Sequence, residues 1–148
     1  MNANFYLNGL TIETERLILR PWKQTDLDDF FEYASVDGVG EMAGWKHHEN
    51  KEKSQSILDL FINDDRTFAI VLKDNNKVIG SLGIEKYGME KVLSEFFDYQ
   101  GREIGFVLSK DYWGKGLMPE AVKAVIDYLF NVANLDFLTC GYYEFNNQ

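Results

Sequence analysis

Cysteine and histidine are scarce in this sequence of 148 residues, which contains one cysteine, Cys140, and two histidines, His47 and His48. One cysteine cannot form an internal disulfide, and the apolar residues around it predict a buried thiol without chemical function. Adjacent histidines point apart in any regular element, and no cysteine or carboxylate spacing typical of a metal site accompanies them. We therefore expect a surface pair of histidines and no metal.

Long apolar runs are absent as well. No segment approaches the roughly 20 residues that span a bilayer, and the first residues lack the basic start and apolar run of a signal peptide. These absences favour a cytoplasmic protein.

Positive charge is in short supply, because 15 Lys and Arg residues stand against 24 Asp and Glu residues and the net charge is -9. A field of this sign repels nucleic-acid phosphates and anionic membrane surfaces, so we expect neither as a partner. It suits a cationic or amine-bearing partner. Taken alone, however, the acidity is better explained by solubility.

Hydrophobic periodicity predicts one α+β domain that spans residues 1–148. With 45% hydrophobic residues and no low-complexity tract, the chain has enough apolar surface to form a core. The expected order is strand, two helices, three strands, helix and strand. The corresponding segments are 17–19, 27–34, 51–63, 67–72, 78–84, 102–108, 119–134 and 137–145, with a hairpin turn at 74–76.

A glycine turn, Trp113-Gly114-Lys115-Gly116, joins the strand that ends at Leu108 to the helix that contains Pro119. Unpaired N–H groups at a helix N-terminus carry a partial positive charge, and glycines let phosphate oxygens approach the backbone. A diphosphate fits such a turn. Short glycine motifs also occur by chance, so an ordinary strand-to-helix turn explains the glycines alone at least as well. The turn lacks the third glycine of the dinucleotide fingerprint, and the sequence contains no P-loop.

Three segments together resemble the GCN5-related N-acetyltransferase family, specifically its branch of ribosomal-protein alanine acetyltransferase-like enzymes. They are Thr14-Glu15-Arg16-Leu17-Ile18-Leu19-Arg20-Pro21, Glu103-Ile104-Gly105-Phe106-Val107-Leu108 and Trp113-Gly114-Lys115-Gly116-Leu117-Met118. The third resembles the Gln/Arg-x-x-Gly-x-Gly/Ala acyl-CoA motif, with Trp113 in place of Gln or Arg and Met118 in place of the small residue, so Gly116 is the conforming glycine. The resemblance implies the family's three-layer α/β sandwich, in which helices flank a mixed, largely antiparallel sheet.

The resemblance also implies acetyl-CoA as co-substrate, without a metal. In the family the fourth and fifth strands splay apart, and the pantetheine arm lies between them. The pyrophosphate takes backbone N–H groups of the glycine turn. Carried over to this sequence, the cofactor-binding residues are Phe106, Val107, Leu108, Trp113, Gly114, Lys115, Gly116, Leu117, Met118 and Asn146.

The implied reaction is direct transfer of the acetyl group to a primary amine, either a protein N-terminus or a small amine, in a ternary complex. Because an α-amine has a pKa of about 8 and a lysine about 10.4, a base must remove a proton. Glu103 is the first candidate base and Glu85 the second, although a solvated or salt-bridged strand carboxylate explains either residue equally well. The resemblance further places Trp45 and His47 at the amine pocket.

Tyr142 and Tyr143 are candidate proton donors to the departing thiolate, with strand packing as the alternative explanation. Members of the family continue from the fifth strand into a further helix and two strands, which this sequence lacks. We therefore expect an unpaired C-terminal edge through which the chain forms a homo-oligomer. Two other functions stay open, namely a CoA-binding remnant or interaction module without catalysis, and a nucleotide-phosphate-binding domain unrelated to CoA.

Overall fold

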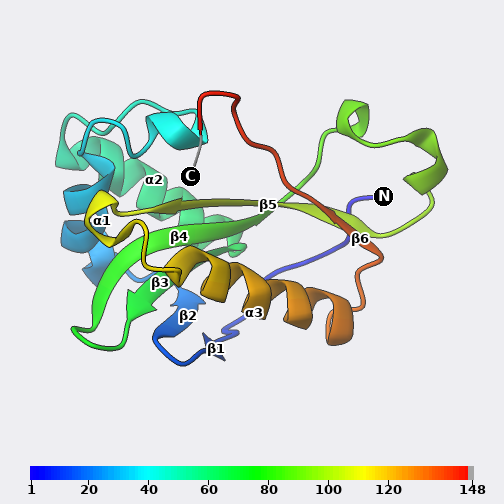
Figure 1. Ribbon diagram of the computed structural model, residues 1–148, viewed down its shortest axis with the longest axis horizontal. Coiled ribbons are helices and arrows are strands. Elements are labelled where there is room, and N and C mark those ends of the chain that lie inside the picture. The colour runs from blue at the N-terminus through cyan, green and yellow to red at the C-terminus, as the bar shows by residue number, and fades with distance from the viewer. Residues whose placement is uncertain (147–148) are drawn as a thin grey trace.

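A six-stranded sheet with the order β1-β2-β3-β4-β5-β6 forms the centre of the molecule, and the computed structural model describes residues 1–146 (Figure 1). The strands are β1 (Ile12–Glu13), β2 (Leu17–Pro21), β3 (Thr67–Leu72), β4 (Lys77–Glu85), β5 (Gly101–Leu108) and β6 (Phe137–Thr139). The helices are α1 (Leu27–Ala34), α2 (Lys51–Asp64) and α3 (Leu117–Asn131). Short 3-10 turns are η1 (Gln24–Asp26), η2 (Glu41–Ala43), η3 (Met89–Lys91), η4 (Ser94–Phe96) and η5 (Lys110–Tyr112).

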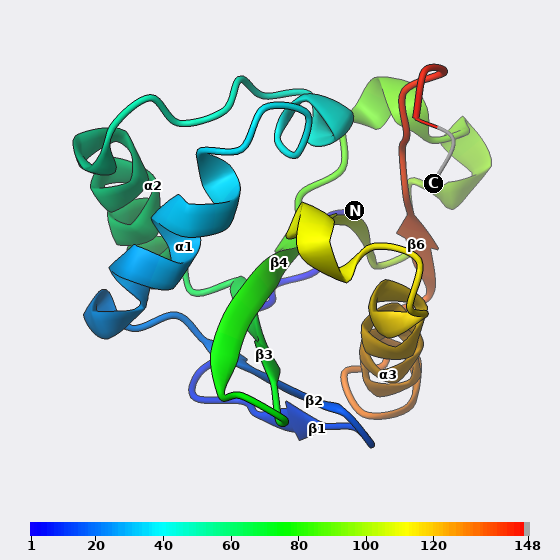
Figure 2. The ribbon, with the colours of Figure 1, turned by 60° about the vertical axis from the view of Figure 1, so that its left-hand side comes forward.

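Helices cover both faces of the sheet, with α1 and α2 on one face and α3 on the other (Figure 2). Both faces of the sheet are apolar and need cover, as strand β2 illustrates: its side chains alternate between two apolar clusters, one on each face. Leu17 and Leu19 are fully buried in the cluster on the α3 face, whereas Ile18 packs against the cluster beneath α1 and α2. The expected three-layer arrangement is confirmed.

Local signals placed most elements correctly. The hairpin of β3 and β4 turns through residues 73–76, where Asn76 adopts the left-handed conformation (φ 56°) that asparagine tolerates well. Helix α2 begins after Asn50, whose side chain accepts a hydrogen bond from the Lys53 N–H at 2.9 Å and so caps the helix. Helix α3 begins at Leu117, slightly before the expected 119, with Gly116 as its N-cap residue.

The last strand is shorter than predicted. Instead of running to residue 145, β6 ends at Thr139, and residues 140–146 leave the sheet toward η2 (Figure 1). There the Asn146 side chain donates a hydrogen bond to the Met42 carbonyl at 3.2 Å, and the Tyr143 ring packs closely against the backbone of Gly44. These contacts with η2 hold the segment away from the path that continued pairing with β5 would require.

The early departure of β6 leaves much of β5 with a free edge. Parallel pairing joins the two strands from Gly101 opposite Phe137 to Glu103 opposite Thr139. Beyond that point β5 continues through residues 104–108 paired with β4 alone, as far as the described part of the chain shows. The strands therefore splay, as the family resemblance implied. Across residues 1–146, no helix has the length and apolar character needed to cross a membrane.

Candidate functional site

A cavity of about 630 Å³ lies where the free edge of β5 meets the start of α3. It is lined by nine of the ten predicted cofactor-binding residues, all except Lys115. Sequence reasoning missed the remaining lining residues, which come from the η2 region, η5 and the first turns of α3: Val39, Met42, Ala43, Tyr112, Pro119 and Val122. The segment around η2 had no motif that would have identified it, because tertiary packing alone brings it to β5.

The glycine turn lies at one end of this cavity and has a backbone geometry that suits an anion. Gly114 and Gly116 both have positive φ, 76° and 73°, and Gly116 is the N-cap of α3. Among residues 1–146, no side chain caps this helix start, so the first N–H groups of α3 have no side-chain acceptor there. A Cβ built on Gly114 would meet no heavy atom within 4 Å, so the glycine leaves open space in which an anion can approach the backbone.

Trp113, which stands in place of the motif's Gln or Arg, fixes the turn against the strand. Its indole N–H donates to the Leu108 carbonyl at 2.8 Å, at the end of β5. One lysine precedes the turn and one belongs to it: the Lys110 ammonium lies 5.9 Å from the Trp113 ring centroid, and the Lys115 ammonium lies 5.4 Å from the Tyr112 ring centroid. Residues 110–116 thus carry two cationic side chains in a protein whose net charge is -9.

A second cavity of about 810 Å³ adjoins the first on the β6 side. The two cavities share Met42, Ala43, Phe106 and Asn146 as lining residues. The second cavity is also lined by Lys91, Glu103, Ile104, Gly105, Cys140, Gly141, Tyr142 and Tyr143. A molecule seated along β5 in the first cavity thus has direct access to the side chains of the second.

The two candidate bases occupy different surroundings. Glu85 and Glu103 are paired residues of β4 and β5, so their side chains project from the same face of the sheet. Glu103 lines the second cavity and forms an ion pair with Lys91 at 3.0 Å. Glu85 lines neither cavity and pairs with Arg66 at 3.0 Å. The position of Glu103 fits a role toward a bound amine better than that of Glu85.

The histidine pair is not a surface pair, because His48 is buried with 4% of its surface exposed. Its Nδ1 lies 2.7 Å from Ser54 Oγ, and its ring contacts Phe30 and Trp45, 5.3 Å and 5.1 Å between ring centroids. Burial, with a smaller effect from the Lys53 charge, lowers the pKa of His48. The neutral ring is therefore a core residue.

His47 is half-exposed, and neither it nor Trp45 lines either cavity; Trp45 packs against the backbone of Gly40. His47 Nδ1 is 3.3 Å from Glu41 Oε1 and 3.7 Å from Asp37 Oδ1. Ligand atoms of these three side chains lie within 4.8 Å of one another, which would suit a metal ion, but such contacts are equally ordinary for a histidine beside exposed carboxylates.

Cys140 and the two neighbouring tyrosines differ from expectation. Cys140 is exposed, not buried, because it follows the last residue of β6, where the chain leaves the sheet. Desolvation and the nearby Glu103 charge raise the pKa of its thiol, which disfavours a nucleophilic thiolate at neutral pH. Tyr142 and Tyr143 lie outside the strand and are exposed along the second cavity, so strand packing does not account for them.

Comparisons with known proteins agree with this geometry. Uncharacterized N-acetyltransferase p20 from Bacillus licheniformis is 32% identical over 133 residues, which cover 85% of this chain and 69% of that protein. The crystal structure of a GNAT-family acetyltransferase from Bacillus anthracis superposes with a TM-score of 0.74 at 24% identity and covers 88% of this chain and 72% of its own. Ribosomal-protein-S5-alanine acetyltransferase from Vibrio fischeri gives a TM-score of 0.65 at 22% identity, covering 93% and 76%.

A family model described as the acetyltransferase (GNAT) domain matches residues 16–148. This match includes β2, the free edge of β5 and the glycine turn, the three places where the sequence itself carries the resemblance. The chain therefore belongs to the GNAT acetyltransferase family, whose members use acetyl-CoA as the acetyl donor.

Proposed function

We propose that this protein transfers the acetyl group of acetyl-CoA directly to a primary amine in a ternary complex. The observation that carries the proposal is the junction of the two cavities at the free edge of β5. One cavity ends at the glycine turn, which suits an anion, and the other is lined by Glu103. A donor and an amine bound on the two sides would meet beside Phe106, which lines both cavities.

The first cavity suits the elongated, anionic donor. Within the described part of the chain, the edge of β5 at residues 104–107 has no strand partner and offers backbone groups to the amides of a pantetheine arm, in the manner of an added strand. The Leu108 carbonyl already accepts from the Trp113 indole. The glycine turn and the first N–H groups of α3 would bind the pyrophosphate, because they are uncapped by side chains and the helix dipole favours negative charge there. Lys110 and Lys115 add cationic charge near the same end.

The second cavity supplies the acid–base chemistry in this proposal. Glu103 takes a proton from the bound ammonium, and the neutral nitrogen then attacks the thioester carbonyl. The new C–N bond forms as the C–S bond breaks, and the second proton that the attacking nitrogen loses passes through Tyr142, Tyr143 or water to the departing thiolate. Until an amine binds, Lys91 neutralises the Glu103 carboxylate, and the incoming ammonium would take over this interaction.

The acceptor that we propose is a protein N-terminus or a small amine. The ribosomal-protein-alanine acetyltransferase-like branch provides the first alternative, because the Vibrio fischeri enzyme named for that activity shares this fold. An α-amine also needs less help than a lysine, since its pKa of about 8 lies closer to neutrality. The acidic surface, net charge -9, suits basic acceptors of either kind.

The proposal is tested by replacing Glu103. Glu103→Gln should bind acetyl-CoA within about two-fold of wild type yet lower kcat/KM for the amine by about 10² to 10⁴-fold at pH 7. The loss should shrink at high pH, where the free amine is abundant. Glu32→Gln is a matched control, because Glu32 is also paired with a lysine, Lys77, but belongs to α1. Free-thiol release with a panel of amines provides the assay.

Three outcomes of that assay would contradict parts of the proposal. Equal rates for Glu103→Gln and wild type at every pH would remove Glu103 from the mechanism. A selective loss in Glu85→Gln would assign the base to Glu85 instead. Acetyl-CoA binding without thiol release from any amine would favour a CoA-binding module over an enzyme.

We also propose that copies of the chain associate through the edge of the sheet at β6. Among the described residues this strand is the last in the sheet order, so its outer edge can pair with another strand. Light scattering at increasing concentration should show a mass above that of the monomer. A constant monomer mass would contradict the association.

A further inference from the structure

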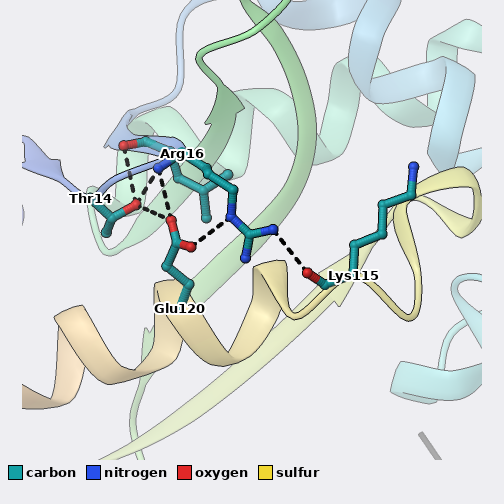
Figure 3. A network of polar contacts seen from close by, with 5 residues as sticks. Thr14, Arg16, Lys115 and Glu120 are labelled. Atoms are coloured by element: carbon teal, nitrogen blue, oxygen red, sulfur yellow. Dashed lines mark hydrogen bonds and ion pairs between the residues drawn. The ribbon is translucent and has the colours of Figure 1, made fainter.

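A polar network joins the segment before β2 to the glycine turn, although the two are about 100 residues apart in the sequence (Figure 3). Arg16 makes both connections. Its Nε donates to Glu120 Oε1 at 2.8 Å, and its Nη1 donates to the Lys115 carbonyl at 2.9 Å. One guanidinium therefore contacts the first turn of α3 and the backbone of the turn that precedes it.

Glu120 is held by the same segment through its second oxygen. Glu120 Oε2 accepts hydrogen bonds from Thr14 Oγ1 at 2.6 Å and from the Arg16 N–H at 3.0 Å. Burial acts to raise the pKa of Glu120, but the hydrogen bonds and charge from Thr14 and Arg16 outweigh it and keep the pKa below its ordinary value. The carboxylate also lies in the first turn of α3, where the helix dipole favours an anion.

The segment that provides these contacts is itself fixed. Thr14 and Leu17 exchange hydrogen bonds, because the Thr14 N–H donates to the Leu17 carbonyl at 2.9 Å and the Leu17 N–H donates to Thr14 Oγ1 at 3.0 Å. Leu17 is fully buried beneath α3. The three residues Thr14, Arg16 and Glu120, which we call the Glu120 brace, thus connect the turn to the core.

The Lys115 carbonyl is where the brace contacts the backbone of the glycine turn. In a trans peptide the C=O of one residue and the N–H of the next point in opposite directions. By holding the Lys115 carbonyl, Arg16 also fixes the direction of the Gly116 N–H, which points away from Arg16. Glycines on both sides of Lys115, with φ of 76° and 73°, would otherwise let this peptide rotate at little cost. Rotation would present a carbonyl oxygen where an anion needs a donor.

We propose that Thr14, Arg16 and Glu120 are positioning residues for the acetyl donor, which hold the 115–116 peptide with its N–H available to the pyrophosphate. The inference rests on the proposed binding of acetyl-CoA at this turn. It also gives a role to the Thr14-Glu15-Arg16 segment, which lines neither cavity.

Two substitutions distinguish positioning of the 115–116 peptide from a simple effect of side-chain charge on donor affinity. Glu120→Gln removes a negative charge near the turn, so charge alone predicts tighter binding of the anionic donor, whereas loss of the brace predicts weaker binding. Arg16→Lys keeps the charge but lacks the planar fork that reaches Glu120 and Lys115 together. Glu13→Gln is the matched control, because it also removes a carboxylate from the segment before β2, one that pairs with Lys73 at 2.6 Å.

The measurement is the dissociation constant for CoA and for pantetheine, which lacks the pyrophosphate, by ligand-detected NMR on the full chain. We expect Glu120→Gln and Arg16→Lys to weaken CoA binding on the order of 10-fold, as loss of a charge-assisted hydrogen bond would. Pantetheine binding should change less than about two-fold, and Glu13→Gln should affect neither ligand. Near-UV circular dichroism identifies any variant that fails to fold. If either Glu120→Gln or Arg16→Lys fails to fold, the CoA and pantetheine affinities of the other variant test the inference.

Other outcomes are equally informative. An equal loss of affinity for CoA and pantetheine would show a general structural role and overturn the inference, as would CoA binding that stays unchanged or tightens. If wild-type protein binds CoA no better than pantetheine, the proposed pyrophosphate site itself is wrong. Failure of the proposed pyrophosphate site can be distinguished from failure of the inference about the brace, because the first is seen with wild-type protein before any substitution is made.

Discussion

Replacing Gly116 by alanine separates backbone strain from ligand binding at the start of α3. At φ 73° an alanine adopts the left-handed conformation at a cost of about 1 to 2 kcal/mol. The smaller freedom of alanine in the unfolded chain offsets about 0.4 to 1 kcal/mol of this. No clash adds to the cost, because the nearest atom to the new Cβ is Arg16 Nη2 at 3.7 Å. We expect a net loss of about 1 kcal/mol, or roughly 2 to 4 °C in Tm.

The effect on the donor should be larger than the effect on stability. Gly116 lines the first cavity, so the new methyl group and any shift of the turn disturb the approach of a phosphate to the backbone. Loss of one hydrogen bond to a charged group costs about 1.5 to 3 kcal/mol, which corresponds to roughly 10- to 100-fold in Kd for CoA. Isothermal titration calorimetry and thermal unfolding measure the two effects on the same sample.

Gly9 provides the matched control. Its φ is 80°, and a Cβ built there would meet no heavy atom within 4 Å, so Gly9→Ala carries the same strain without a clash. It does not line either cavity. Gly9→Ala should lose similar stability and keep its CoA affinity. The reasoning is refuted if Gly116→Ala binds CoA as tightly as Gly9→Ala does.

Two further predictions concern the core beneath α1 and α2. The pKa of His48 is lowered from its ordinary value of 6.5 in the folded protein, so the stabilisation from its neutral ring is fully present above pH 6.5. This stabilisation should be lost as the pH falls toward the lowered folded pKa. In urea unfolding at pH 7 and pH 5, the free energy of unfolding of His48→Gln should therefore decline less than that of wild type. Leu58→Ala should cost about 2 to 5 kcal/mol by chemical denaturation, whereas Leu60→Ala on the same helix should cost under about 1 kcal/mol. Leu58 is fully buried and Leu60 is 53% exposed, so equal losses would contradict the assigned packing.

Elements that depend on neighbouring residues could be predicted from the sequence. The alternation of Leu17, Ile18 and Leu19 fixes both faces of β2, and the Asp74-Asn75-Asn76 turn fixes the β3–β4 hairpin, since both signals act within a few residues. The donor side of the proposed site could also be predicted from neighbouring residues. A strand, a glycine turn and a helix follow one another in the chain, so their order alone assembles most of the first cavity.

Features that depend on distant residues were mispredicted. The apolar stretch after Phe137 predicted a long strand with a buried Cys140, but contacts of Tyr143 and Asn146 with η2 draw the chain out of the sheet. His48 gave no local sign of burial, because its pocket forms only when Phe30 and Ser54 come together. Local pattern carries no information about such contacts between segments.

The donor and acceptor sides of the proposed site differ in the same way, because neighbouring residues form the first and distant residues form the second. Donor binding relies on backbone groups of β5 and the glycine turn, which consecutive residues place, and the Glu120 brace then restricts the one peptide that glycines leave free. The acceptor side is assembled from Lys91, Glu103 and the 140–146 segment, which tertiary contacts alone bring together. Substitutions at the turn should therefore affect every acetyl donor alike, whereas changes in residues 140–143, which line only the second cavity, should alter which amine is accepted and leave CoA affinity largely intact.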